Sequence, residues 1–131
     1  MKTLKLFLVL VVILISSINT QAQDVIKFKT TSCSFKETGD SDWSDWKTLS
    51  VLVVVETSRI TIYAKDTKVF DIIKTTFDGE DSDGDYVSEY VAIDEKGAKC
   101  ELIVLRIKDA EDLTFCVKYS NVTIAYSIYQ L

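Results

Sequence analysis

The densest group of charged side chains is an acidic segment between positions 78 and 85, which carries Asp78, Asp81, Asp83 and Asp85. Carboxylates spaced around a glycine can gather on Ca²⁺, which takes about six to eight oxygen ligands. The EF-hand pattern is not met, because aligning Gly84 with its sixth position puts Gly79 and Tyr90 where carboxylates belong. These four aspartates therefore predict either a Ca²⁺ site or a solvated turn whose Asp and Gly residues supply the loop geometry.

Aromatic side chains are the second group with a chemical use, and four of them are candidates for contact with a ligand: Trp43, Trp46, Tyr119 and Tyr126. Exposed aromatic rings stack on sugars and apolar molecules, and inward tyrosines can line a cavity with hydroxyls. The alternatives are a tryptophan lid over one end of the fold and tyrosines that pack within a sheet. The four residues predict a site for a small apolar molecule or a glycan.

Enzymatic chemistry has few residue types to work with in this chain. There is no histidine, which excludes Ser-His and Cys-His nucleophile pairs and imidazole metal ligands. The three cysteines do not form a Cys-x-x-Cys pair. Paired carboxylates for glycoside hydrolysis need a cleft, and a chain this short leaves little room for one. We expect a protein that is not an enzyme and has no catalytic residues.

Residues 1–22 predict a cleavable secretory signal peptide. Lys2 and Lys5 form a basic start, an apolar run extends from Leu6 to Ile15, and small polar residues lead to Ala22. The apolar run is too short for a membrane span, which needs about twenty residues. No cysteine stands at the end of the leader, so a lipid anchor is not expected. The sequence predicts a periplasmic or secreted protein with no stable membrane anchor.

The mature chain, residues 23–131, is acidic. Lys2 and Lys5 belong to the leader, which leaves 13 of the 15 basic residues against 20 acidic ones, a net charge of −7. An acidic surface repels nucleic acid, because binding a polyanion requires Lys and Arg. The length fits a single domain. A protein or a small ligand is therefore the expected partner, and nucleic acid is not.

The elements that must position these side chains are β-strands. Val, Ile, Thr, Tyr and Phe recur in short runs separated by Asp, Ser, Gly or Asn, which is typical of strands. The pattern predicts eight of them, at 25–35, 47–55, 59–65, 69–77, 86–94, 98–107, 113–119 and 122–130. Their short loops predict an all-β, antiparallel up-and-down meander, either a small barrel or a β-sandwich. We favour the barrel, because closure removes exposed strand edges.

The loops also predict which residues pair. A two-residue turn at Ser120 and Asn121 pairs Phe115 with Tyr126 and puts the large apolar residues of both strands on one face. The other loops predict three further pairs: Val53 with Ile62, Ile62 with Ile72, and Val91 with Cys100. The segment 100–107 is apolar on both faces, so its register against 113–119 stays open, with a bulge or burial of both faces as the alternatives.

A closed meander places the remaining residues relative to one another. Its first strand lies beside its last, which makes Cys33 and Cys116 the reachable pair for a disulfide; free core thiols are the alternative. Successive loops alternate between the two ends of the barrel. The acidic residues of the 36–46 loop (Glu37, Asp40, Asp42 and Asp45) therefore lie at the opposite end from the 78–85 loop and do not share a site with it.

The two tryptophans, followed by a buried strand and a meander, resemble lipocalin- or avidin-type barrels in architecture. The short Lys-led leader resembles those of small exported bacterial β-proteins of unassigned function. The first resemblance implies a barrel, and neither implies an activity.

Three functions follow as hypotheses. The first is an exported domain for protein or surface interaction, motivated by apolar residues on both faces of segments such as Leu102 to Ile107, together with Leu52 and Val54. The second is a carrier whose barrel cavity holds a small ligand. The third is a module stabilised by Ca²⁺, the one ion or cofactor that the sequence suggests.

Overall fold

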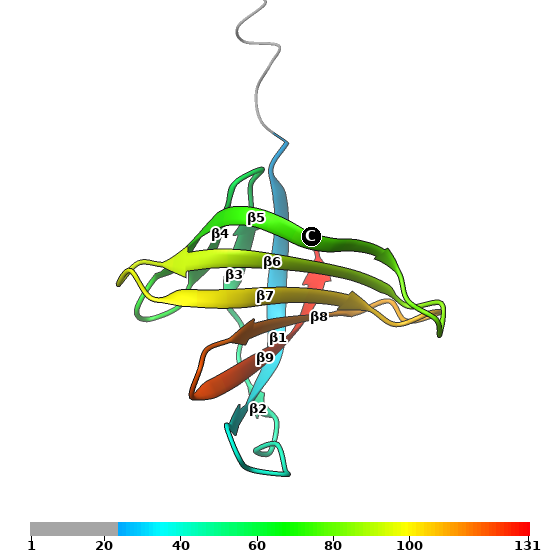
Figure 1. Ribbon diagram of the computed structural model, residues 1–131, viewed down its shortest axis with the longest axis horizontal. Helices are drawn as coiled ribbons and strands as arrows, with labels where there is room; N and C mark the ends of the chain where they lie inside the picture. The colour runs from blue at the N-terminus through cyan, green and yellow to red at the C-terminus, as the bar shows by residue number, and fades with distance from the viewer. Residues whose placement is uncertain (1–23) are drawn as a thin grey trace, which may run out of the picture.

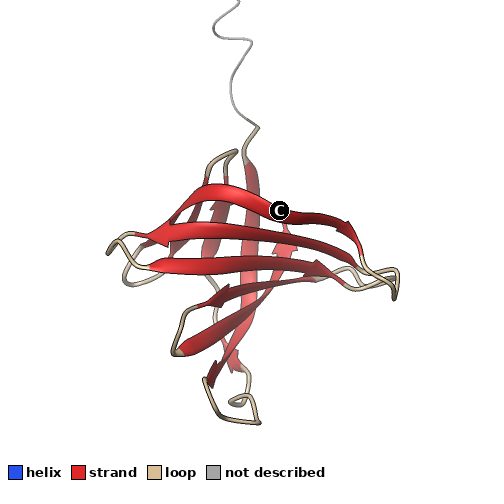
Figure 2. Cartoon of the chain, in the orientation of Figure 1, coloured by secondary structure: helices blue, strands red, loops and turns tan. Residues whose placement is uncertain are grey.

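The computed structural model describes residues 24–131, and the predicted leader lies outside this part. The described chain consists of strands and loops (Figure 2). Its strands are β1 (Ile26–Glu37), β2 (Lys47–Thr48), β3 (Leu52–Val55), β4 (Arg59–Tyr63), β5 (Lys68–Glu80), β6 (Tyr86–Asp94), β7 (Lys99–Arg106), β8 (Leu113–Lys118) and β9 (Val122–Gln130). Within residues 24–131 there is no apolar helix of membrane-spanning length.

The strands form one closed sheet. Consecutive strands from β3 to β9 pair antiparallel, β1 pairs with β3, and β9 returns to pair with β1 along most of its length (Figure 1). Eight strands therefore make a barrel, and β2 is a short extra strand beside β1. The predicted all-β meander is confirmed in its barrel form, so the sandwich alternative is excluded.

One predicted strand is interrupted. The segment 47–55, which the sequence predicts as continuous, is divided into β2 and β3 by residues 49–51. The buried hydroxyl of Thr30 on β1 fills the gap: its Oγ1 donates to the Leu49 carbonyl (2.6 Å) and accepts from the Val51 N–H (2.9 Å). A side chain thus replaces backbone partners that the sheet would otherwise supply.

β5 is the longest strand and extends beyond its neighbour β4. Only its residues Lys68 to Asp71 pair with β4, whereas pairing with β6 runs on to Glu80. The β5–β6 hairpin therefore continues past β4, with β7 beside it (Figure 1). Two bulges, after Ile72 and after Thr75, interrupt this stretch of β5. Bulges of this kind twist an unpaired edge away from regular strand addition.

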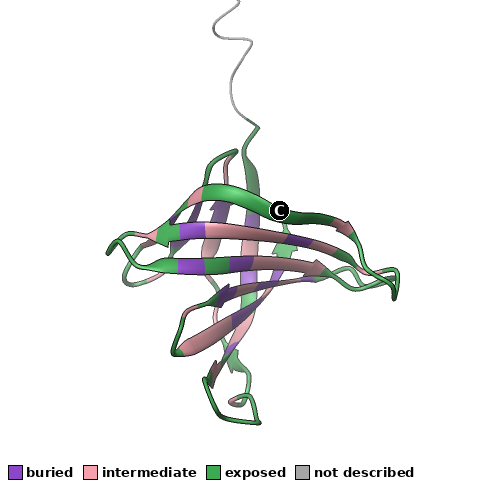
Figure 3. Cartoon of the chain, in the orientation of Figure 1, coloured by how far each residue is buried: buried purple, intermediate pink, exposed green. Residues whose placement is uncertain are grey.

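The core lies inside the barrel and is built from alternate residues of each strand (Figure 3). Phe115 lies at its centre, stacked on Tyr126 with ring centroids 6.0 Å apart and edge-on to Phe70 at 6.5 Å. The largest fully buried side chains are Phe70, Phe115, Ile62, Leu102, Val53 and Val117. Buried residues recur with a period of two along β8 (Leu113, Phe115 and Val117) and along β9 (Tyr126 and Ile128), as a sheet with one inward face requires.

The predicted pairing is confirmed at two hairpins and wrong at two. Phe115 pairs with Tyr126, and Val53 pairs with Ile62, as predicted. Ile62 instead faces Lys68, a shift of four residues that leaves the inward face unchanged. Cys100 faces Ala92 and not Val91, a shift of one residue that exchanges the two faces of the strand. The open register of β7 is settled by the pair Leu102–Val117, which places Leu102 inside.

Candidate functional site

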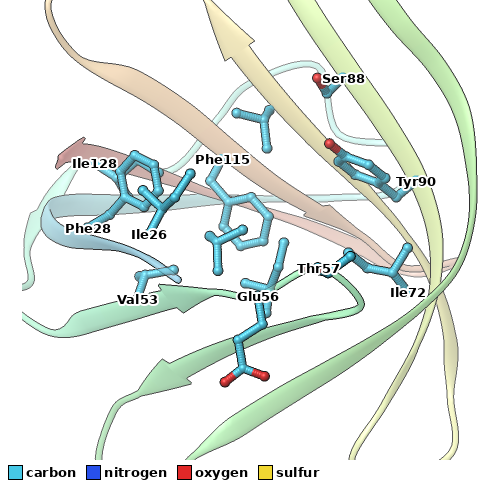
Figure 4. A pocket seen from close by; sticks show the side chains of 13 residues that line it. Ile26, Phe28, Val53, Glu56, Thr57, Ile72, Ser88, Tyr90, Phe115 and Ile128 are labelled. Atoms are coloured by element: carbon cyan, nitrogen blue, oxygen red, sulfur yellow. The ribbon is translucent and has the colours of Figure 1, made fainter. Parts of the chain in front are cut away.

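The barrel interior contains a cavity of about 190 Å³. It lies beneath the β3–β4 turn, and side chains from all eight strands of the barrel line it (Figure 4). Its apolar lining is Ile26, Phe28, Val53, Val55, Ile60, Ile72, Val104, Phe115 and Ile128. Its polar lining is Glu56, Thr57, Ser88 and Tyr90. Because apolar side chains dominate the wall, the cavity suits an apolar molecule better than water.

One row of inward-facing residues explains where the empty space lies. Across four neighbouring strands, Tyr126 pairs with Phe115, Phe115 with Val104, and Val104 with Ser88. The side chains shrink along this row from aromatic rings to a hydroxymethyl group. The interior is therefore filled beside β8 and β9, where the rings stack, and hollow beside β6.

Two of the four polar lining residues lie on β6, and the other two lie in the β3–β4 turn. Ser88 is buried and Tyr90 is half-buried, and the Tyr90 ring leans from β6 into the cavity with its hydroxyl on the side of Ser88 (Figure 4). The carboxylate of Glu56, by contrast, points away from the other lining side chains. A ligand would thus meet hydroxyl groups on one wall and hydrocarbon on the others.

Asp78 anchors this polar wall from β5. Its Oδ1 accepts hydrogen bonds from the Tyr86 hydroxyl (2.6 Å) and the Ser88 hydroxyl (2.8 Å). These two bonds stabilise the carboxylate and hold the pKa of Asp78 below its ordinary value. The same bond to Asp78 raises the pKa of Tyr86. At neutral pH the wall therefore carries a fixed carboxylate whose charge is partly offset by two hydroxyl donors.

A second hollow, of about 370 Å³, adjoins the cavity on the side where β6 and β7 extend outward. It is lined by Tyr86, Ser88, Val104, Arg106 and Leu113. Ser88 and Val104 line both spaces. The apolar interior thus continues into a more polar mouth.

The predicted aromatic ligand site is not assembled. Trp43 lies outside the barrel, in a surface groove that it shares with Ile103 and Cys116, and Trp46 is exposed. Tyr126 is packed in the core against Phe115. The Tyr119 hydroxyl donates to Asp94 Oδ2 (2.8 Å) in the β6–β7 turn. The four aromatic residues therefore do not line a common cavity.

The predicted Ca²⁺ residues are brought together in part. Carboxylate oxygens of Asp81, Asp83 and Asp85 lie within 4.8 Å of one another, and Asp78 stands apart in the Tyr86–Ser88 network. Asp81 Oδ1 accepts from the N–H groups of Asp83 and Asp85, and Asp85 Oδ1 accepts from the Lys108 N–H. These bonds are those of a self-capped turn, so Ca²⁺ binding stays a prediction of the sequence.

The two acidic loops lie at opposite ends of the barrel, as predicted. Thr38, at the start of the first loop, donates from its N–H to the Asn121 carbonyl and from its hydroxyl to the Ser120 carbonyl. The 81–85 loop bonds instead to Lys108, in the β7–β8 loop. The cavity opens at the second of these ends.

The predicted Cys33–Cys116 disulfide is not formed, and all three cysteines are free thiols. Cys33 pairs across the sheet with Tyr126, whereas Cys116 pairs with Ala125. Because adjacent residues of β9 point to opposite faces, the two cysteine side chains lie on opposite sides of the sheet. Barrel closure thus brings the strands together without bringing the sulfur atoms together.

Sequence analysis missed the residues that shape the cavity, above all Ile72, Ser88, Tyr90 and Val104. The alternation of Tyr86, Ser88, Tyr90 and Ala92 was a usable signal. It identifies the inward face only when the register of β6 against β7 is known, and the predicted pair Val91–Cys100 put the opposite face inside.

Comparisons with protein families, curated proteins and solved structures find no match. The fold and the site therefore define the class by themselves: an eight-stranded antiparallel meander barrel with an apolar cavity open at one end.

Proposed function

We propose that this protein binds a small, mainly apolar molecule inside its barrel and acts as a carrier or sensor of that molecule, not as an enzyme. The supporting observation is the cavity itself. At about 190 Å³ it is somewhat larger than the engineered apolar cavity of about 150 Å³ that holds benzene. We further propose that binding takes place outside the cytoplasm, after removal of residues 1–22.

The chemistry of the lining supports binding over catalysis. The polar wall on β6 consists of the hydroxyl groups of Ser88 and Tyr90. The carboxylate bonded to Ser88, Asp78, already accepts two hydrogen bonds. The predicted role in protein association rested on residues of β3 and β7. These strands are separated by β4, β5 and β6, so Leu52 and Val54 do not form one patch with Leu105 and Ile107. That role stays a hypothesis with less geometric support than the cavity.

Filling the cavity tests this function. Val104 points into it, so Val104→Trp should occupy much of the space and abolish benzene binding. Leu105→Trp, on the outward face of the same strand, is the matched control and should bind normally. Binding is measured by the increase in unfolding free energy with added benzene, which is about 1.4 kcal/mol at ten times Kd, and by NMR shifts of lining residues.

The two variants separate binding from general destabilisation. Circular dichroism and the unfolding midpoint show whether each tryptophan variant is folded. Equal benzene binding by wild type, Val104→Trp and Leu105→Trp, or no binding by any of them, would contradict the proposed function.

A further inference from the structure

The apolar cavity leads to a positively charged group. Val104 and Arg106 are both inward positions of β7, two residues apart, and Arg106 pairs with Tyr86 across the β6–β7 ladder. Two residues of a strand span about 7 Å. A molecule seated in the cavity and passing Val104 would therefore reach Arg106 within a few bond lengths.

The guanidinium of Arg106 is not used by the fold. Among residues 24–131 it has neither an ion pair nor a hydrogen bond with another side chain or backbone group, whereas Arg59 is paired with Asp71 at 2.8 Å on the outer face. A guanidinium presents five N–H donors in a planar fork that matches a carboxylate. Arg106 therefore has its full donor capacity available at the mouth.

The negative charge beside this wall belongs to Asp78, and the two hydrogen bonds that it accepts do not neutralise it. Asp78 Oδ1 accepts from Tyr86 and Ser88, and Asp78 lies two strand positions from β7, about 10 Å away. A cationic head group at the mouth would be repelled by the Arg106 guanidinium. A second negative charge on the head group would add to its repulsion by Asp78. A single negative charge near Arg106 satisfies both conditions.

We propose that the ligand is a small monoanionic amphiphile, a carboxylate with an apolar tail of about six to eight carbons, whose tail fills the cavity and whose carboxylate binds Arg106. This inference rests on the proposed function and adds the chemical class of the ligand. Ser88 and Val104, which line both the cavity and its mouth, lie between the two parts of such a molecule.

A series of probes with one tail and different heads tests the proposal on the full mature chain. Octanoate should bind at least about tenfold more tightly than octan-1-ol, octylamine or octyl phosphate, measured by calorimetry at neutral pH and fixed salt. Arg106→Gln should lower octanoate affinity by about tenfold and leave octanol affinity unchanged. Arg106→Lys, which keeps the charge but not the fork, should retain part of the preference.

Matched control variants separate the contribution of the carboxylate head group to affinity from that of the apolar tail. Arg59→Gln removes an arginine from the outer face and should change neither affinity. Val104→Trp should weaken octanoate and octanol alike. The carboxylate proposal fails, while the cavity function stands, if benzene and octanol bind but octanoate binds no more tightly than octanol. It also fails if Arg106→Gln leaves the affinity for octanoate unchanged. Tightest binding of octylamine would also overturn it. Failure of benzene and all four octyl probes would reject the proposed function itself.

Discussion

Thr30 shows how one side chain can hold a strand junction together. Its own N–H donates to the Val51 carbonyl (3.0 Å), and its hydroxyl bonds to both Leu49 and Val51. The residue is 1% exposed, so water cannot replace these partners. The gap between β2 and β3 is therefore bridged to β1 by a single buried hydroxyl.

Thr30→Val should destabilise the protein by about 1–3 kcal/mol, because it keeps the shape of the side chain but leaves a buried N–H and a buried carbonyl without partners. Urea unfolding monitored by circular dichroism measures the loss. Thr31→Val is the control, since Thr31 is exposed and its hydroxyl lies 3.4 Å from the Ser127 carbonyl. Thr30→Ser should lose less than Thr30→Val. Equal losses for the two valine variants would refute this role.

At the scale of the elements, Asp94 fixes the β6–β7 turn. Its Oδ1 accepts from the N–H groups of Lys96 (3.0 Å) and Ala98 (2.8 Å), and its Oδ2 accepts from the Tyr119 hydroxyl on β8. Burial acts to raise the pKa of Asp94, but the hydrogen bonds from Ala98, Tyr119 and Lys96 outweigh it, and the pKa is lowered overall. One carboxylate thus joins the turn to the next strand.

The lowered pKa of Asp94 has a consequence for acid stability. A carboxyl group with a lower pKa in the folded state contributes stability at neutral pH, and that contribution is lost as the pH falls below about 4. Asp94→Asn should cost about 1–2 kcal/mol at pH 7, and the difference from wild type should shrink below about pH 3. Urea titrations at pH 7, 5 and 3 measure it. A difference that stays constant with pH would contradict the assignment.

The same turn explains how far the sequence could predict the fold. The β8–β9 hairpin was predictable, because the two-residue turn at Ser120 and Asn121 and a clean apolar alternation agree on one register. The β6–β7 hairpin was not. Asp94 pairs with Ala98 around a three-residue loop in which Gly97 has a φ of +83°, whereas the sequence equally allows a four-residue loop.

Because β7 is apolar on both faces, its sequence has no alternation of polar and apolar residues that would reveal the wrong register between β6 and β7. The cavity could not be predicted from the sequence for the same reason. A void is defined by every inward side chain around it, so one wrong face on β6 hides Ser88 and Tyr90. The row from Tyr126 to Ser88 becomes visible only when three registers are correct together.

At the scale of the whole molecule, barrel closure separates and shields the cysteines. Burial first, and then the charges of Asp94 and Glu95, raises the pKa of Cys100 to about 11. Burial also raises the pKa of Cys116. Because the thiolate is the reactive form, the raised pKa makes both thiols less reactive toward oxidation and alkylation in the folded protein.

We expect three free thiols in the purified protein. Mass spectrometry after alkylation in denaturant, without reductant, should show three modified cysteines, and the unfolding midpoint should not change when a reductant is added. In the folded protein at neutral pH, alkylation of Cys100 should be slow and should become fast on unfolding. Two cysteines that resist alkylation in denaturant, or an unfolding midpoint that falls when reductant is added, would instead indicate a disulfide.

The pairing of the first strand with the last also sets when the cavity can exist. The Leu131 N–H donates to the Lys27 carbonyl (2.9 Å), so the two ends of the described chain lie side by side. During synthesis β9 leaves the ribosome after the other strands described here, and until then β1 lacks its longest neighbour. A nascent chain therefore has no enclosed cavity until β9 has emerged. The same adjacency makes the barrel a natural candidate for circular permutation, with the old ends joined and a new opening cut in a surface loop.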